Sequence, residues 1–494
     1  MNKWEDLELA GKQTLGPDKE QPLKSREKHA IVLGGSLAGL MAARVLRDHF
    51  DRVTVIERDV YPKSITPRRG VPQANHVHGL MVRGRLILEQ LFPGFQDELV
   101  AAGAPLLDLA NDVAWLTPEG WGVRFESDLR VLSFTRPLLD HHVRKRMASE
   151  HRVQILENTE VVRLLPGKQS KGIKGVSIRT RNDASRDAPE LQLFADLVVD
   201  ATGRGSQAKR WLAEIGHPPL EETVVNAHLG YASRFYRVPP SFKADWRCLI
   251  VQAAPPKRKR GGIIFLVEGD RWLLTLIGGG YDYPPTTELE FLEFARSLES
   301  PLIYEAIRNP EPLTPILGYK GTENRLRHFE RSGCLPENFI ALGDSVCAFN
   351  PVYGQGMTIA AIGAMTLADC LDAHKRGEIK TSFTSEFQQR LARVNEAPWL
   401  MATSQDLRYR ETVGGSASAK TRFMHSYMDA VMRLASFDVR TREVLLRVYA
   451  MLIKPTAPFQ PRIIFSAIGQ ALGLVRPKVQ RTPISLTDRF RISS

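Results

Sequence analysis

The sequence is poor in cysteine and lacks an apolar segment at its start. Four cysteines occur in 494 residues, and none forms a CxxC pair. This scarcity argues against a disulfide framework or a structural zinc site, and it favours a reducing compartment. Residues 1–27 are polar and charged, without the apolar core of a secretory signal. We therefore expect a flexible N-terminal tail and a cytoplasmic protein.

Acidic residues are scarce toward the C-terminus. The formal charge is +12, and residues 401–494 hold 15 Lys and Arg against 6 Asp and Glu. No zinc-finger, RRM or KH pattern accompanies this charge, so we expect no nucleic-acid binding. A solvated basic face is the simplest interpretation. The apolar stretch 463–475 could cap the substrate domain, which we favour, or make weak contact with an anionic membrane surface.

Apolar runs of strand length recur far apart along the chain. Residues 28–33 and 52–57 flank a helical pattern over 38–50, which together predict a βαβ unit. Residues 195–200 and 338–343 are further short apolar runs, as expected where separated segments build one parallel sheet. Between about 225 and 320, strand-length apolar runs predict an antiparallel sheet. Residues from 396 onward have helical periodicity.

A glycine-rich turn, Gly34 to Gly39, lies between the first strand and its helix. A dinucleotide site needs a tight turn, a close backbone approach to the pyrophosphate and a small residue where helix meets strand. Ser36 replaces the second glycine of GxGxxG and is still small. The helix start offers free N–H groups to the phosphates. Glu57 ends the second strand, 23 residues after Gly34, where an acid accepts hydrogen bonds from ribose hydroxyls.

A second motif follows more than three hundred residues later. Gly343 and Asp344 end a strand, so the carboxylate can meet a chain of sugar-like hydroxyls. Residues 350–357 read NPVYGQGM and lead into a helix rich in small residues. The start of such a helix would stabilise the negative charge of a reduced flavin. Together the two motifs favour FAD over NAD.

The motifs resemble those of the FAD-dependent monooxygenases with the p-hydroxybenzoate-hydroxylase fold. The matching segments read GGSLAGL, VIERD, DLVVDATGRGS and GDSVCAFNPVYGQGM, and the resemblance covers roughly residues 28–400. The stretch RRGVPQANHVH at 68–78, NPVYGQGM and the APW of 397–399 look especially like the polyene epoxidases of polyether biosynthesis.

The resemblance implies a particular domain organisation. The fold class is α/β (α+β), with a Rossmann-like FAD-binding domain in discontinuous segments, an antiparallel β-sheet substrate domain and a helical C-terminal region. The expected boundaries are 1–27 for the tail, 28–224 and 326–395 for the FAD-binding domain, 225–325 for the substrate domain and 396–494 for the helical region. A small substrate-side insertion is expected near 106–130.

The resemblance also implies which residues surround the cofactor. Arg136 matches the family arginine that heads a helix beside the FAD phosphates, and Asp344 would meet the ribityl chain. The implied cofactor-binding residues are Gly34, Gly35, Ser36, Ala38, Gly39, Glu57, Arg58, Arg69, Arg136, Asp200, Gly203, Gly343, Asp344, Pro351, Gly354, Gly356 and Met357. The implied flavin-ring environment, with no side-chain base, comprises Pro351, Gly354, Gln355 and Gly356.

The middle segment departs from the aromatic hydroxylases of the family. Those enzymes have Asp-Gly where this chain has Asp200-Ala201-Thr202-Gly203, a form closer to the epoxidase, halogenase and geranylgeranyl-reductase branches. The electron source is therefore open between NAD(P)H used directly and a separate flavin reductase. His76 and His78 form an HxH pair, but no third ligand stands at a suggestive spacing, so we expect no metal site.

The expected function is that of a FAD-dependent monooxygenase. It would insert one oxygen atom of O2 into a lipophilic alkene or aromatic substrate, by epoxidation or hydroxylation, through a flavin C4a-hydroperoxide. Oxygen transfer of this kind needs a dry pocket more than a side-chain base. Phe265, Trp272 and Tyr231 are candidates to line it. Three alternatives stay open: a FAD-dependent reductase or dehydrogenase acting on isoprenoid double bonds, a flavin halogenase, and a non-catalytic FAD-binding partner or membrane-associated sensor.

Overall fold

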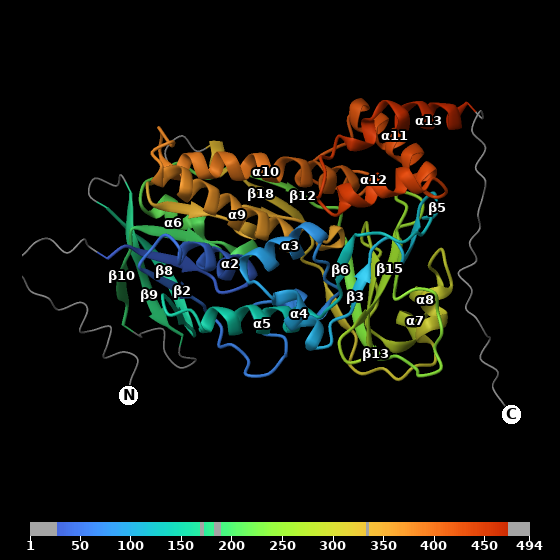
Figure 1. The fold of residues 1–494 in the computed structure, drawn as a ribbon, viewed down its shortest axis with the longest axis horizontal. Coiled ribbons are helices and arrows are strands. Elements are labelled where there is room, and N and C mark those ends of the chain that lie inside the picture. Colours follow the sequence, from blue (N-terminus) through green and yellow to red (C-terminus); the bar gives the residue numbers. More distant parts are fainter. Residues whose placement is uncertain (1–26, 168–171, 182–188, 332–334, 473–494) are drawn as a thin grey trace, which may run out of the picture.

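The computed structural model describes residues 27–167, 172–181, 189–331 and 335–472. The expected tail, apart from Glu27, lies outside these residues, as does the end of the 463–475 stretch. The parallel sheet and its helices form one half of the molecule, and the larger sheet, antiparallel except for the β14–β4 pair, forms the other with the last helices (Figure 1).

Five parallel strands form the centre of the first half, in the order β19-β11-β1-β2-β7. Most strand residues are apolar because both faces of a parallel sheet are usually covered, with Thr54 in β2 and Gln154 in β7 among the exceptions. Their bounds are β1 (His29–Leu33), β2 (Arg52–Ile56), β7 (Val153–Leu156), β11 (Leu197–Asp200) and β19 (Phe339–Ala341). Four of the five coincide with the apolar runs identified in the sequence, and the predicted α/β class is confirmed.

Helix α9 (Gly356–Lys375) packs against α2 (Leu37–Leu46), α3 (Val82–Leu91) and α10 (Phe383–Asp406). Among the described residues, α9 is the one helix long and apolar enough to cross a membrane by length and composition. However, 67% of its apolar window is buried inside the protein. It is therefore a core helix of this fold.

Seven strands form the sheet of the second half, in the order β17-β13-β16-β15-β14-β4-β5. Helices α7 (Glu288–Arg296) and α8 (Leu302–Ile307) cover one face, where Phe291 and Ile303 join the core of the sheet. We call the opposite face the inner face; it packs against α12. The strand bounds are β4 (Val113–Thr117), β5 (Gly120–Trp121), β13 (Gly230–Arg237), β14 (Cys248–Val251), β15 (Arg260–Val267), β16 (Arg271–Gly278) and β17 (Leu317–Tyr319).

The alternation of strand side chains corrects one expectation about the substrate pocket. Phe265 lies on the inner face in a cluster with Leu446, and Tyr231 lies on the same face, where its hydroxyl donates to Asn350 Oδ1. Trp272 lies on the opposite face, 2% exposed and packed with Phe291. Successive strand residues point to opposite faces, so Trp272 is core packing and not pocket lining.

Helices α10 to α13 form the last part of the described chain. Helix α10 continues across the expected boundary at 395/396, and α11 (Ala419–Ala435), α12 (Val439–Tyr449) and α13 (Pro461–Ala471) lie at one end of the molecule over the larger sheet (Figure 1). One side of α13 packs inward through Ile463 and Ala467, whereas Phe465 and Ile468 are exposed. Contact of this helix with a membrane surface stays a prediction.

Smaller elements complete the described chain. They are α4 (Phe95–Ala101), α5 (Arg136–Ala148), α6 (Ala208–Glu214), β3 (Leu106–Asp108), β6 (Arg130–Leu132), β8 (Thr159–Pro166), β9 (Ile173–Thr180), β10 (Leu191–Phe194), β12 (Glu222–Val225), β18 (Asn324–Arg327) and β20 (Cys347–Ala348).

Candidate active site

The glycine-rich turn brings the end of β1 against the end of β11. Gly34 has a φ of +96°, and a Cβ atom there would lie 2.5 Å from the carbonyl oxygen of Ala201. A Cβ atom on Gly39 would lie 1.8 Å from the carbonyl oxygen of Gly34. Only glycine fits these two positions, and the N–H groups of the first turn of α2 have no helical partner. The turn therefore has the geometry of a pyrophosphate cradle, with Ser36 as the helix N-cap.

Glu57 stands directly behind the turn. Its Oε2 accepts from the backbone N–H of Gly35 at 2.9 Å and pairs with Nη1 of Arg68 at 2.9 Å. Its Oε1 accepts from the backbone N–H of Asp59 at 2.9 Å. A carboxylate offers about four lone-pair sites, so one acceptor site is left for a ribose hydroxyl.

Tyr61 covers the same turn, and the sequence pattern does not reveal it. Its hydroxyl donates to the carbonyl oxygen of Gly35 at 2.6 Å. The guanidinium groups of Arg68 and Arg144 lie 5.3 and 4.7 Å from its ring centroid. Burial, followed by the charge of Glu57, raises the pKa of Tyr61 well above its usual range, so the phenol is neutral. Tyr61 and its arginines form a wall at the adenosine end of the candidate site.

The loop that carries Arg68 and Arg69 places Arg68, not Arg69, at this site. The Arg68 side chain is buried on Glu57, whereas Arg58 and Arg69 are exposed. Two adjacent arginines in a sequence do not show which side chain turns inward, so the sequence alone does not identify Arg68. The contribution of Arg58 and Arg69 to cofactor binding stays a prediction.

Arg136 reaches the glycine-rich turn from another segment. It is the first residue of α5, as expected, and Thr135 caps that helix. Its Nη2 donates to Oγ of Ser36 at 3.0 Å, and its Nε donates to Asp140 Oδ1 at 2.7 Å. The guanidinium is thus held beside the cradle, where it adds positive charge next to the α2 N-terminus.

The second motif lies against the first. A Cβ atom on Gly343, which has a φ of +63°, would lie 2.8 Å from Cβ of Ala38. Asp344 follows, and its carboxylate has no hydrogen-bond partner among the described residues, although Arg204 and Arg136 are near enough to act on it electrostatically. Burial outweighs these charges and raises its pKa. This half-buried carboxylate has no protein partner and stays accessible to a ligand, so it indicates a ligand with hydroxyl donors.

The middle segment supports this arrangement from within. Asp200 is fully buried, and its Oδ1 accepts from Thr202 N–H at 2.9 Å and from Ser345 Oγ at 3.1 Å. Its Oδ2 accepts from Ser206 Oγ at 2.5 Å. The backbone N–H of Gly203 donates to Ser345 Oγ at 2.8 Å. Asp200 thus supports the turn that follows β11 through these hydrogen bonds. The Gly203 backbone, rather than Asp200, lies nearer to Asp344.

The loop at 350–356, the flavin-side loop, runs between the two halves of the protein. Pro351 begins a short 3₁₀ turn, Gly354 has a φ of +64°, and α9 begins at Gly356, followed by buried Met357. The Oε1 atom of Gln355 is buried and has no hydrogen-bond partner. An unpaired buried amide oxygen on this loop again indicates a ligand donor.

A buried carboxylate on α10 holds this loop. Asp406 Oδ1 accepts from the Tyr353 hydroxyl at 2.5 Å, and its Oδ2 accepts from Asn324 Nδ2 at 2.6 Å. Asn350 Nδ2 donates to the same carboxylate at 3.3 Å. Asn350 Oδ1 accepts from the Tyr231 hydroxyl on the inner face at 2.7 Å. The network ties the loop, the substrate sheet and α10 into one unit.

Both histidines of the HxH pair make hydrogen bonds within the protein. His76 Nδ1 bonds Ser233 Oγ at 2.7 Å, and Val77 N–H donates to Thr275 Oγ1 at 2.9 Å. Burial lowers the pKa of both His76 and His78 to about 4. Over the described ranges, no group of three or more metal-ligating side chains gathers anywhere. The pair therefore anchors its loop to the inner face.

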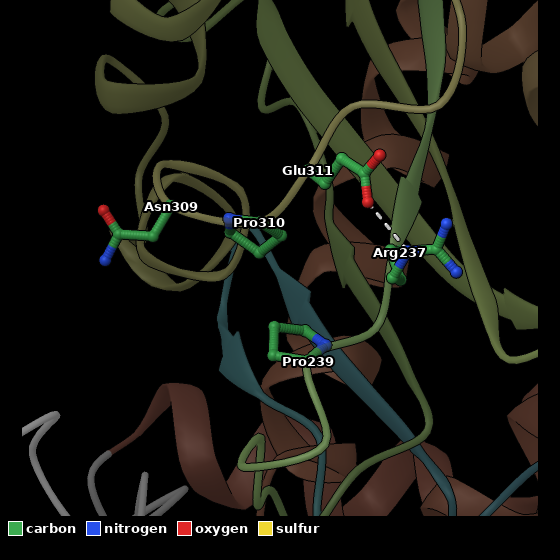
Figure 2. A pocket seen from close by; sticks show the side chains of 5 residues that line it. All are labelled: Arg237, Pro239, Asn309, Pro310 and Glu311. Atoms are coloured by element: carbon green, nitrogen blue, oxygen red, sulfur yellow. Dashed lines mark hydrogen bonds and ion pairs between the residues drawn. The ribbon is translucent and has the colours of Figure 1, made fainter.

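Two hollows lie on the larger sheet. One, of about 270 Å³, is lined by Arg237 and Glu311 with neighbouring prolines and Asn309 (Figure 2). Its Arg237–Glu311 ion pair of 2.8 Å is largely exposed, and it lies far along β13 from the flavin-side loop. The other, of about 490 Å³, is lined by Tyr231 and Tyr319. It adjoins the site because Tyr231 bonds the flavin-side loop.

Comparison with known proteins establishes the fold. No known family profile matches the chain. The Protein Rv3254 of Mycobacterium tuberculosis strain H37Rv is 29% identical over 465 residues, which cover 92% of this chain and 97% of that protein. The flavin-dependent brominase Bmp2 superposes with a TM-score of 0.62 at 15% identity, covering 91% of this chain and all of the brominase. The p-nitrophenol 4-monooxygenase PnpA from Pseudomonas putida DLL-E4 gives 0.59 at 18% identity, covering 86% and 98%.

The chain therefore has the fold of the FAD-dependent monooxygenases and halogenases. The residues present fit the FAD that this fold binds. The cradle at Gly34 and Gly39 excludes side chains, Gln355 holds a buried acceptor without a partner, the half-buried Asp344 carboxylate has no protein partner, and Glu57 keeps one free acceptor site. These features lie along one path from the end of β2 to the start of α9.

Proposed function

We propose that this protein is a FAD-dependent monooxygenase that inserts one oxygen atom of O2 into a lipophilic alkene or aromatic substrate, by epoxidation or hydroxylation. The observation that carries the proposal is the placement of the flavin-side loop. It ends at Gly356, where a Cβ atom would lie 3.8 Å from Oδ1 of Asp344, an acceptor without a partner, and it is tied through Tyr231 to the inner face of the larger sheet. The sequence resemblance to the polyene epoxidases favours a conjugated alkene.

The chain's own residues would position the cofactor and exclude water. The glycine-rich turn and Arg136 would hold the pyrophosphate, Glu57 the ribose and Asp344 the ribityl hydroxyls. When bound, FAD supplies the reaction of a reduced flavin with O2. The start of α9 would stabilise negative charge on the ring, because unpaired N–H groups and the positive end of the helix dipole face it. The inner face would provide a dry, apolar surface for the substrate.

No side-chain base is assigned. Oxygen transfer to an alkene requires no proton abstraction, and His76 and His78 are each committed to other contacts and have low pKa values. We propose that electrons come from NAD(P)H, directly or through a separate flavin reductase. The Asp200-Ala201-Thr202-Gly203 segment favours the second route.

The test separates the flavin-dependent reactions by their products. The purified protein with FAD is reduced by dithionite without air, mixed with a conjugated polyene, and then exposed to O2. A product heavier by one oxygen atom, and labelled when 18O2 is used, is expected. A saturated product formed before air is admitted would assign the isoprenoid-reductase activity, and a brominated or chlorinated product in the presence of halide would assign a halogenase. A colourless protein that takes up no FAD would refute all three.

A further inference from the structure

Arg442 on α12 is buried without a counter-ion. Its side chain belongs to a residue that is 6% exposed, and no carboxylate of the described chain lies within ion-pair distance. Its guanidinium carbon lies 5.3 Å from the ring centroid of Trp115. On its other side is Gly122, where a Cβ atom would lie 2.5 Å from Cζ of Arg442. Its Nε is fully buried and has no hydrogen-bond partner.

The acids nearby are already engaged by other groups. Glu119 pairs with Arg433 at 2.7 Å, and Asp128 pairs with Arg447 at 2.7 Å. Asp438 accepts from Thr441 N–H as the N-cap of α12. None of them moves to Arg442 without giving up its present partner.

An unpaired buried charge is strongly unfavourable. Burial alone lowers the pKa of Arg442 to about 10, with no acid to oppose the change, so the guanidinium is still charged at neutral pH. A cation–π contact with Trp115 recovers only part of this cost. In a chain with a proposed small-molecule substrate, the missing partner is an anion on the ligand.

The guanidinium is joined to the flavin-side loop by aromatic rings. Trp115 contacts the ring of Tyr449 edge-on, with centroids 5.2 Å apart. The Tyr449 hydroxyl lies 3.6 Å from where a Cβ atom on Gly354 would be, and it makes no hydrogen bond to a described residue. Arg442 therefore stands two side chains away from the place where the flavin ring is proposed to lie.

A row of mostly apolar side chains crosses the larger sheet from Trp115 toward the His76 loop. Trp115 pairs with Ile250, Ile250 with Ile263, and Ile263 with Thr275, one residue from each of four neighbouring strands. The three apolar members keep part of their surface exposed although α12 packs over this face. Strands lie about 4.8 Å apart, so the row spans about 14 Å between the guanidinium end and the His76 loop.

We propose that Arg442 binds the carboxylate of a lipophilic unsaturated acid, whose hydrocarbon chain lies along this row with its double bonds toward the flavin-side loop. The assignment rests on the proposed function for the identity of the site, and it replaces a neutral substrate with an anionic one. Arginine suits the task because its planar fork binds a carboxylate with two parallel hydrogen bonds.

The experiment measures binding, not turnover. The probe is cis-parinaric acid, a fluorescent conjugated tetraenoic acid, compared with its methyl ester on the full-length protein purified with its flavin. We expect the wild-type protein to bind the acid about 10- to 100-fold more tightly than the ester, as for a charged hydrogen-bonded pair. Arg442→Met should remove this preference, with little change in ester affinity.

Two further variants separate a ligand contact from a structural one. Gly122→Ala keeps the charge but displaces the guanidinium, so it should also reduce the acid preference. Arg440→Met removes an exposed cation from the same helix and should leave both affinities unchanged. If Arg442 were structural, Arg442→Met would lower the melting temperature; an unpaired buried charge predicts an unchanged or higher one.

The assignment is wrong if the wild-type protein binds the acid no better than the ester, or if Arg442→Met leaves the acid affinity within twofold. These outcomes are independent of the proposed function, which depends on FAD uptake and labelled oxygen. A protein that binds the acid but never oxygenates a polyene would keep the anion site and lose the monooxygenase.

Discussion

Replacing Asp406 with asparagine tests whether a single carboxylate holds the flavin-side loop. The residue is fully buried and receives hydrogen bonds from Tyr353, Asn324 and Asn350. Asparagine has the same shape, but one of its two acceptor oxygens becomes an NH2 group. The Asn324 amide cannot rotate to compensate, because its Oδ1 already accepts from Asn350 N–H at 2.7 Å. The protonated acid has one O–H donor, whereas the amide has two N–H donors, so one donor is left in the core without an acceptor, at a cost of about 1–3 kcal/mol.

The stability difference should also depend on pH. Burial, partly offset by the hydrogen bonds, raises the pKa of Asp406 to about 7, against an ordinary value near 3.9 in the unfolded chain. A raised folded-state pKa means that the stability is present at low pH and is lost as pH rises toward 7. The loss is about 1.4 kcal/mol per pH unit in that window. The slope halves as pH reaches the folded-state pKa, so the advantage of the wild-type protein over Asp406→Asn should fall by about 2 kcal/mol between pH 5 and pH 7.

The assay is urea unfolding of both proteins at pH 5, 6, 7 and 8, followed by tryptophan fluorescence. Taking the difference between the two proteins cancels the other titrating groups, including neutral Tyr231 and Tyr409 beside the carboxylate. Asp429→Asn, which removes a partly exposed partner of Arg408, is the matched control and should give a difference independent of pH. Parallel wild-type and Asp406→Asn curves from pH 5 to pH 7 would refute the reasoning.

Four other substitutions probe the cofactor site, the last of them as a control. Gly34→Ala forces a side chain into a positive-φ position against Ala201, so about 1–3 kcal/mol of stability should be lost. The variant should also lose its flavin, measured by the 450 nm absorbance that co-elutes with the protein on gel filtration. Asp344→Asn should weaken FAD binding about 10- to 100-fold in a fluorescence titration, and a lowered melting temperature of the apoprotein would contradict its lack of a protein partner. Arg68→Ala breaks a buried ion pair and should cost about 3–5 kcal/mol in chemical unfolding. Arg69→Ala changes an exposed side chain and should cost less than about 0.5 kcal/mol, so equal effects of the two would contradict the structure.

The elements that sequence reasoning located share strong local signals. Buried parallel strands must be apolar throughout, so four of the five could be found from their runs, and the Gly34 turn could be found because only glycine fits it. The fifth strand, β7, has Gln154 in its middle, which interrupts the apolar run, so the strand does not stand out in the sequence. Strand alternation was harder to use, since without the register nothing showed that Trp272 faces away from Phe265.

The residues of the candidate site also fall into those with a strong local sequence signal and those without one. Residues that touch a cofactor through backbone or glycine geometry are in motifs, so Gly34, Gly343 and the flavin-side loop could be identified. Tyr61, Asp406 and Arg442 could not, because each stands in ordinary local sequence and acquires its role from partners 26 or more positions away. Tertiary contacts of this kind leave no periodic signal.

Asp406 and Arg442 also show where substrate choice is located. Both charges come from helices that follow the FAD-binding segments, and both are buried, yet neither contacts the glycine-rich turn. Asp406 acts on the loop that borders the flavin, whereas Arg442 faces the far end of the apolar row. A change in α12 can therefore alter which ligand is held while leaving the cofactor cradle intact. Arg442→Met should accordingly retain FAD as well as the wild-type protein does, and loss of flavin from that variant would show that the two sites are not separate.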